Sequence, residues 1–528
     1  MILRKKGDYL KKADAGGLDG LSGNGSPLAG YCVFMVGLLV FYIFAGLFES
    51  REISRFANWF GPMVFIAASV VVCYKLLRAN PALIWTPLPW LLMAVAVEFG
   101  FGPLVYTFGN WATLESIDSV WHVNSAGLLR TNVLNTFGMA VMALSFLWVV
   151  RKVKFAGLDR MIMPSSENGI KILAVVFFCI GAAVKYGLSL PYEFGMMNFI
   201  LPGSIYQIKQ LTLLALILFA YLAATSREAK WKIALLVFLP VELVTNLLRF
   251  TKMSLLLTIL MPFLGWFMAN RKIKVLVAGA AVCALTYVLI TPVVTWSRDE
   301  IGRINRYHMT QSYGGTFYKI SLRQRVAIAF ESLTRGGESA DESGGPDNVQ
   351  AWWARLNFAP NEDFVMREYD NGRPSTDYSN ILWVFVPRFI WKDKPVMTQA
   401  GLKLSELMFG VKNSSIGTGI FADAYYNGGW LMLAIVCSVV GCILAIMSRL
   451  ALIILQKNAF LFLPCVLLAI RIGFMVEGGF VVAYLGPAAV YAAYFALCLF
   501  LVKKAKQRNP LVAGGVSGIA SKEGLTRP

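Results

Sequence analysis

The sequence predicts an all-α polytopic membrane protein, on the basis of its composition, its long apolar runs and the placement of its basic residues. Of the 528 residues, 57% are hydrophobic and 13% aromatic, and the mean hydropathy is +0.61. Apolar runs of about 20 residues recur along the chain, which is the length that an α-helix needs to cross a bilayer. The runs are continuous and do not alternate with polar residues, which argues against an outer-membrane β-barrel.

The apolar runs predict about twelve transmembrane helices. They lie near residues 28–48, 59–77, 84–107, 131–150, 170–190, 208–225, 231–248, 253–270, 273–294, 429–447, 459–477 and 479–502. The predicted parts are a cytoplasmic tail (1–27), a bundle of helices one to nine (28–294), a large outward loop with interfacial helices (295–428), helices ten to twelve (429–502) and a second cytoplasmic tail (503–528).

Basic residues between the runs set the predicted orientation. The N-terminal tail is basic and has no cleavage-like region, so we expect it to be retained in the cytoplasm. With this end inside, loops such as "RKVK" at 151–154 and "NRKIK" at 270–274 are cytoplasmic, and so is the basic C-terminal tail. This agrees with the positive-inside rule. The net charge of +19 therefore reflects membrane topology and predicts no nucleic-acid partner.

The sequence predicts no metal and no cofactor. All eight cysteines fall inside apolar runs, and His122 and His308 are the only histidines. Neither a disulfide framework nor a thiolate or imidazole metal site is indicated. The chain also lacks a phosphate-binding loop, a dinucleotide-binding glycine motif and an Asp-x-Asp pair, so an enzyme that uses ATP or a sugar nucleotide is not expected.

Two predicted outward places carry cations against the positive-inside rule. One is "RFTK", from Arg249 to Lys252, and the other is the loop 295–428, which contains 15 basic and 15 acidic side chains. Connections as long as this loop are usually functional. In its segment "PRFIWKDKP", the proline after Lys394 favours an extended backbone, which places Lys392 and Lys394 on one side. Together with Arg388 they would face an anion, although contact with lipid headgroups is the alternative.

These cations suit a substrate that carries its own activation, such as a polyprenyl-diphosphate-linked sugar. Without a metal, Arg and Lys must neutralise the departing diphosphate, and an acceptor hydroxyl needs a base to take its proton. The cation candidates are Arg249, Lys252, Arg298, Arg355, Arg388, Lys392 and Lys394. The base candidates are Asp377, Asp423 and His308.

Several of these candidates have a simpler interpretation. Arg249 can be a snorkelling residue at a helix end, Arg355 can stack on Trp353, and His308 can be a surface residue in a charged helix. Glu98 and Lys185 lie deeper in apolar runs, where an unpaired charge is costly, so they either form a structural pair with each other or contact substrate.

Three segments resemble the Wzy-type oligosaccharide repeat-unit polymerases, the family that builds O-antigen, enterobacterial common antigen and related exopolysaccharides. "VPRFIWKDKP" is similar to a family signature of proline, a basic residue, aromatic residues and a basic residue before proline. "TNLLRFTKMSLL" places Arg249 at the outer start of a mid-chain helix, without the small residues usual before it. "SSIGTGIFADAYYNGGW" places Asp423 where glutamate is more usual.

The resemblance implies a GT-C-like layout in the bacterial inner membrane and an inverting, metal-independent glycosyl transfer on the periplasmic face. Arg249 and Arg388 would grip a diphosphate with help from Lys392 and Lys394, and Asp423 would orient the acceptor or act as base. The implied partners are undecaprenyl-diphosphate-linked donor and acceptor, membrane lipid and a chain-length regulator.

Two other functions remain open from the sequence. An O-antigen ligase uses the same donor, and a lipid-linked oligosaccharide transporter or flippase would need broken helices and charges near the midplane.

Overall fold

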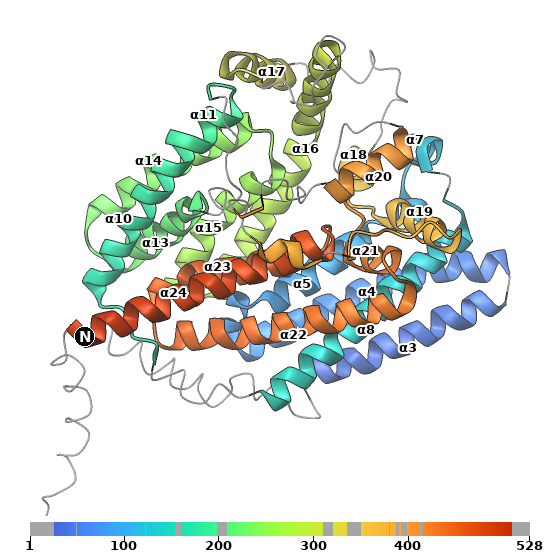
Figure 1. Ribbon diagram of the computed structural model, residues 1–528, viewed down its shortest axis with the longest axis horizontal. Helices are drawn as coiled ribbons and strands as arrows, with labels where there is room; N and C mark the ends of the chain where they lie inside the picture. The colour runs from blue at the N-terminus through green and yellow to red at the C-terminus, as the bar shows by residue number, and fades with distance from the viewer. Residues whose placement is uncertain are drawn as a thin grey trace, which may run out of the picture. The chain divides into compact units, whose positions relative to one another are not determined.

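The computed structural model describes residues 26–48, 50–121, 123–153, 161–197, 208–309, 320–334, 350–379, 381–386, 390–391, 399–410 and 416–508. Every regular element within these ranges is a helix (Figure 1). Ten helices of the described residues are long and apolar enough to cross a membrane. The predicted class, an all-α polytopic membrane protein, is therefore confirmed.

The ten helices match ten of the predicted spans. They are Pro27–Leu47, Arg51–Ala79, Pro87–Phe108, Ser125–Lys152, Glu167–Glu193, Ala229–Leu248, Lys252–Asn270, Ile273–Ile304, Gly429–Gln456 and Val481–Lys504. The predicted runs 208–225 and 459–477 correspond to shorter apolar helices, Leu211–Thr225 and Phe460–Phe474. At 1.5 Å per residue, 15 residues extend about 22 Å, which is less than the hydrocarbon thickness of about 30 Å.

The chain divides into two compact units. The first unit comprises Met1–Pro103, Val123–Ser165 and Phe358–Pro528, and the second comprises Leu104–His122 and Ser166–Asn357. The helices of the first unit are α3 (Pro27–Leu47), α4 (Arg51–Ala79), η2 (Pro81–Trp85), α5 (Pro87–Val95), η3 (Ala96–Phe101), α8 (Ser125–Lys152), α19 (Ala359–Asp370), η5 (Ile381–Phe385), α20 (Gln399–Phe409), α21 (Ile420–Tyr426), α22 (Gly429–Gln456), η6 (Phe460–Phe462), α23 (Leu463–Phe474), η7 (Val481–Leu485) and α24 (Gly486–Arg508).

In the first unit α8 packs along both α22 and α3, and α3 and α4 form an antiparallel hairpin (Figure 1). At one end of this bundle Ser26 and Lys75 border the same hollow, and Arg151 lies near Cys32. At the opposite end Gly46 of α3 faces Leu129 of α8. The basic residues near the C-terminal ends of α4 and α8 are thus gathered at one end of the unit.

The second unit is built around α13 and α15, which pack against each other and against their neighbours in sequence. Its helices are α6 (Val105–Phe108), α7 (Trp111–Trp121), α10 (Glu167–Val184), η4 (Lys185–Ser189), α11 (Leu190–Glu193), α13 (Leu211–Thr225), α14 (Ala229–Leu248), α15 (Lys252–Asn270), α16 (Ile273–Met309), α17 (Leu322–Thr334) and α18 (Ala351–Ala354). The helix α16 continues past the predicted end of its span at residue 294.

The second unit also has a distinct end where basic residues gather. There Lys171 at the start of α10 pairs with Glu228 before α14 at 2.7 Å, and Arg271 after α15 lies near Tyr221 of α13. The helical run α10–η4–α11 begins near Lys171 and ends at Glu193, and α14 begins after Glu228 and ends before Arg249. Glu193 and Arg249 therefore lie at the opposite end of the unit.

Close packing of α22 on α8 depends on Gly441. A Cβ at this position would lie only 3.0 Å from Ser145 Cβ and 3.1 Å from the Phe146 nitrogen. We expect Gly441→Ala to force the two helices apart and to destabilise the protein by about 1–3 kcal/mol, the usual cost of overpacking. The measurement is thermal unfolding in detergent, and Gly37→Ala is the matched control, because no atom lies within 4 Å of a Cβ there. Equal melting temperatures for the two variants would contradict this account of the interface.

Candidate functional site

The structure separates the candidate residues by charge. Arg249, Lys252, Arg298 and Arg355 lie in the second unit, and Asp377 and Asp423 lie in the first. Three further candidates, Arg388, Lys392 and Lys394, lie outside the described residues, and so does the side chain of His308.

Arg249 is held at the end of α14 by a carboxylate from another helix. Its Nε donates to Glu193 Oε2 at 2.5 Å, and its Nη2 donates to Glu193 Oε1 at 3.1 Å. Glu193 Oε1 also accepts a hydrogen bond from Lys209 Nζ at 3.0 Å. Arg249 makes a two-point contact with a carboxylate and is largely buried. It is therefore not a snorkelling side chain, whose charged end would extend into water.

The polar contacts continue from Arg249 into the bundle. Arg249 Nη1 donates to Asn246 Oδ1 at 3.2 Å, and Lys185 Nζ donates to the same oxygen at 3.5 Å. Lys185 also pairs with Glu242, and both side chains are almost fully buried. Of the two alternatives for Lys185, the structural pair with Glu98 is therefore wrong. The partner of Lys185 is Glu242 of α14, an acidic residue within an apolar run.

Arg325 of α17 adds a fourth cation to this group. Its guanidinium donates to the carbonyl oxygens of Leu248 at 3.3 Å and Glu193 at 3.4 Å, and it lies 5.4 Å from the centre of the Phe194 ring. Burial lowers the pKa of Arg325, although Glu193 opposes this shift.

We refer to these residues as the Arg249 cluster. Its cations are Lys185, Lys209, Arg249 and Arg325, and its carboxylates are Glu193 and Glu242. The described part of the cluster therefore has two positive charges in excess. Because charge is expensive to bury without a counter-charge, such an excess favours binding of an anion.

The other three predicted cations of the second unit lie close together. Lys252 begins α15 and lies 5.5 Å from the centre of the Tyr287 ring, and Arg298 and Arg355 are the charges that act on it. Arg298 Nε donates to the carbonyl oxygen of Phe250 at 2.9 Å. The backbone that follows Arg249 thus contacts a second basic group, Lys252, Arg298 and Arg355, which we call the Lys252 group.

Asp423 in the first unit ties three segments together. Its Oδ2 accepts hydrogen bonds from Tyr378 Oη at 2.5 Å and from the Phe480 backbone N–H at 2.8 Å. Burial raises the pKa of Asp423 to about 6, although both hydrogen bonds oppose this shift. These contacts give Asp423 a positioning role for α21 and for the start of η7.

Asp377 directly precedes Tyr378 in the sequence and is also hydrogen-bonded. It accepts hydrogen bonds from Ser375 Oγ at 2.8 Å and from Lys403 Nζ at 3.2 Å. Its charge contributes to the raised pKa of Asp423, so the structure brings these two predicted base candidates into electrostatic reach of each other.

Glu362 is a buried carboxyl that sequence reasoning missed. Asn135 Nδ2 donates to its Oε2 at 2.9 Å, and its Oε1 has no hydrogen-bond partner among the described residues. Burial raises the pKa of Glu362 from 4.5 to about 8, so the side chain is mainly protonated at neutral pH. Glu477 and Glu362 are the acidic residues that act on Glu98, which places an acid-rich region in the first unit.

The site residues that the sequence analysis did not identify differ in whether their sequence context could have revealed them. Glu242 and Glu193 were visible as acidic residues within or at the end of apolar runs. Glu362 and Arg325 lie in the mixed-charge stretch, where no local pattern distinguishes them from exposed residues.

No protein-family model, no curated protein and no solved structure matches this chain.

Glu362 should make the stability of the protein depend on pH. Because its pKa is higher in the folded protein than in the unfolded chain, its stabilising contribution is complete below about pH 4 and is lost as the pH rises through 8. We expect the melting temperature of Glu362→Gln to fall less between pH 5 and 8.5 than that of the unchanged protein. Glu52→Gln, at an exposed position, is the control. Parallel pH profiles for all three proteins would argue against a protonated Glu362.

The Asp423–Tyr378 contact should be measurable in a double-mutant cycle. We expect Asp423→Asn and Tyr378→Phe each to lower the free energy of unfolding by about 1–3 kcal/mol, because each leaves a buried polar group with a weaker or missing partner. The losses should not add in the double variant. Additive losses would mean that the two side chains act independently.

Proposed function

We propose that this protein is a glycosyltransferase that polymerises polyprenyl-diphosphate-linked oligosaccharide repeat units into a bacterial surface polysaccharide. In this proposal the chain crosses the inner membrane about twelve times in a GT-C-like layout. Both tails are cytoplasmic, and the segment 295–428 forms a large periplasmic loop with interfacial helices.

The observation that carries the proposal is the charge of the Arg249 cluster. Its excess of two positive charges lies at the ends of apolar helices, where a lipid-borne anion can approach along the membrane. A diphosphate supplies the missing negative charge, and the arginine forks bind phosphate oxygens two at a time. The polyprenyl chain would lie along the apolar surface of the bundle.

The reaction is a displacement at the anomeric carbon of the donor. An acceptor hydroxyl forms the new C–O bond as the bond from carbon to the diphosphate oxygen breaks, and the electron pair leaves with the diphosphate. The cations stabilise that leaving group, and a carboxylate takes the hydroxyl proton. Asp377 and Asp423 are the two described candidates for that carboxylate, and each accepts two hydrogen bonds in this structure.

The donor and acceptor in this proposal are both undecaprenyl-diphosphate-linked, and the growing chain passes from one lipid to the sugar end of the other. A chain-length regulator protein is a proposed partner.

One observation favours a second candidate, a lipid-linked oligosaccharide flippase. Lys185 and Glu242 form their pair inside predicted spans, η3 and η4 interrupt two of the spans with π-helical turns, and η7 begins a third with such a turn. Transporters use such internal charges and irregular helices to bind and move a substrate. A flippase would move the lipid-linked repeat unit without lengthening the glycan.

Arg249→Gln tests the polymerase directly. Purified protein is incubated with a synthetic polyprenyl-diphosphate repeat unit in the presence of EDTA, and products are separated by length. We expect a ladder for the unchanged protein and a loss of at least about 100-fold for Arg249→Gln, because one charge-assisted contact to the leaving group disappears. Arg303→Gln is the matched control, since Arg303 is exposed and pairs with Glu300 three residues before it.

The double variant Arg249→Gln/Glu193→Gln separates catalysis from folding. It removes both charges of the Arg249–Glu193 pair and also the carboxylate that binds Lys209, so its melting temperature is measured first, and the folded variant should make no ladder. A normal ladder from this variant would refute the proposal. So would a failure of the wild-type protein to consume any of the repeat units tried.

A further inference from the structure

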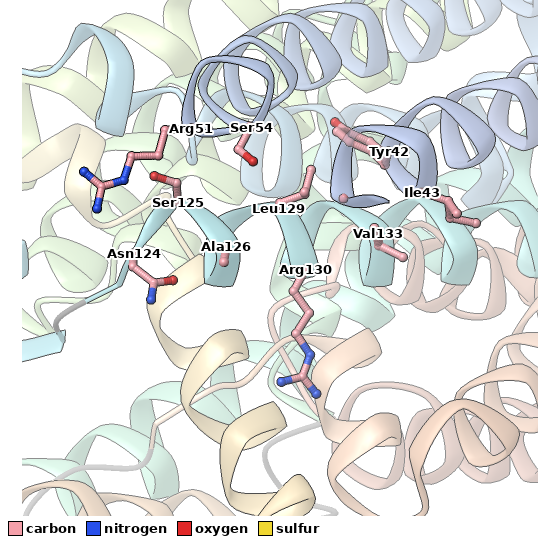
Figure 2. Close-up of a pocket in the computed structure, with 11 residues that line it drawn as sticks. Tyr42, Ile43, Arg51, Ser54, Asn124, Ser125, Ala126, Leu129, Arg130 and Val133 are labelled. Carbon is pink, nitrogen blue, oxygen red and sulfur yellow. The ribbon is translucent and has the colours of Figure 1, made fainter. Parts of the chain in front are cut away.

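A cavity of about 640 Å³ opens in the first unit where α3 ends and α4 and α8 begin (Figure 2). Its size falls within the range of roughly 300–1,000 Å³ that is typical of ligand sites. The polar residues of its wall are Tyr42 of α3, Arg51 and Ser54 of α4, Asn124 before α8, and Ser125 and Arg130 of α8. In Figure 2 Ser54 and Ser125 lie beside Arg51, and Arg130 points away from them.

The two arginines differ in how they are bound. Arg130 pairs with Asp370 at the end of α19 and donates to Tyr425 Oη at 3.1 Å, so its charge is already balanced. Arg51 is exposed and has no ion-pair partner in the described part of the chain. Arg51 is therefore the group at the mouth of this cavity that is available to an anion.

Two helix N-termini reinforce the positive potential at the same place. Helix α4 begins at Arg51 without a side-chain cap from Ser50, and α8 begins at Ser125, next to the cavity. The Asn124 side chain caps only the Gly127 N–H. The first backbone N–H groups of a helix carry partial positive charge, and they add to the charge of Arg51.

The rest of the wall is apolar. Ile43 of α3 and Leu129 and Val133 of α8 line the cavity, and Leu129 and Val133 lie one turn apart along the same helix. Ile43 is 48% exposed, so this side of the cavity is open to the surface of an apolar helix. A charged mouth above an apolar wall is complementary to an amphiphile and not to a free anion.

We propose that this cavity binds a phosphate-bearing lipid, with the phosphate at Arg51 and the first part of the hydrocarbon chain along Ile43, Leu129 and Val133. The proposal goes beyond the polymerase and does not depend on it. A polyprenyl phosphate and an anionic phospholipid share this chemistry. Because Arg130 joins the cavity to Tyr425, two residues from Asp423, the lipid would lie beside the segment that Asp423 positions.

Photo-crosslinking tests the site without reference to polymerisation. The full chain, with Val133 replaced by p-benzoylphenylalanine, is purified in maltoside micelles, which contain no phosphate. Four lipids are added in separate arms: polyprenyl phosphate, phosphatidylglycerol, polyprenol and diacylglycerol. We expect crosslinks to one or both phosphate-bearing lipids to exceed those to the uncharged lipids by roughly tenfold, the effect of a hydrogen bond to a charged group. The stronger phosphate arm identifies the source of the ligand.

Variants at the mouth assign the effect to Arg51. Arg51→Gln should reduce the crosslink to the phosphate-bearing lipid by roughly tenfold, and Arg55→Gln, one turn further along α4 and outside the cavity, should leave it unchanged. A probe at Leu144, which is exposed on α8 away from the cavity, should crosslink all lipids equally in every variant. Equal crosslinking of charged and uncharged lipids at position 133, or no effect of Arg51→Gln, would overturn the proposal.

Discussion

The cost of burying charge in an apolar helical bundle is the constraint on which the arrangement of this protein depends. A single charge at the centre of a membrane costs about 2.5–3.5 kcal/mol on insertion scales, so each one must find a partner. Lys185 and Glu242 meet this requirement together, and in doing so they join η4 to α14. The same requirement acts at the helix ends, where Glu193 binds both Arg249 and Lys209. The network therefore stabilises the second unit and at the same time holds its guanidinium and ammonium groups in place.

The two units meet the constraint in chemically different ways. The second unit keeps more cations than carboxylates in its Arg249 cluster. The first unit avoids buried negative charge by keeping Glu362 protonated, with a pKa of about 8, and by surrounding Asp423 with hydrogen-bond donors. A fixed positive site suits a multiply charged anion, whereas a buried carboxyl with a raised pKa can hold or release a proton near neutral pH.

The sequence was enough to predict the helices, because each one depends on hydropathy over neighbouring residues. It also identified Arg249, Lys252, Arg298 and Arg355, since cations in predicted outward segments stand out against the positive-inside pattern. It could not predict the partners. Glu242 is 57 residues from Lys185, and Glu193 is 56 residues from Arg249, so pairing depends on how α10, α13 and α14 pack. The same limit explains why Glu98 and not Glu242 stood out as a possible partner of Lys185.

The position of the arginines along each unit gives the strongest reason to expect an anionic ligand. In the first unit Lys75 and Arg151 lie at one end and Arg51 at the other, and in the second unit Lys171 and Arg271 lie opposite Arg249. If the ends richer in Lys and Arg are cytoplasmic, as the positive-inside rule requires, both Arg51 and Arg249 lie on the side where membrane insertion disfavours them. A local carboxylate would remove that difficulty, but Arg51 has no such partner in the described chain, and Glu193 is shared with Lys209. The remaining positive charge is best matched by a ligand that arrives from the membrane.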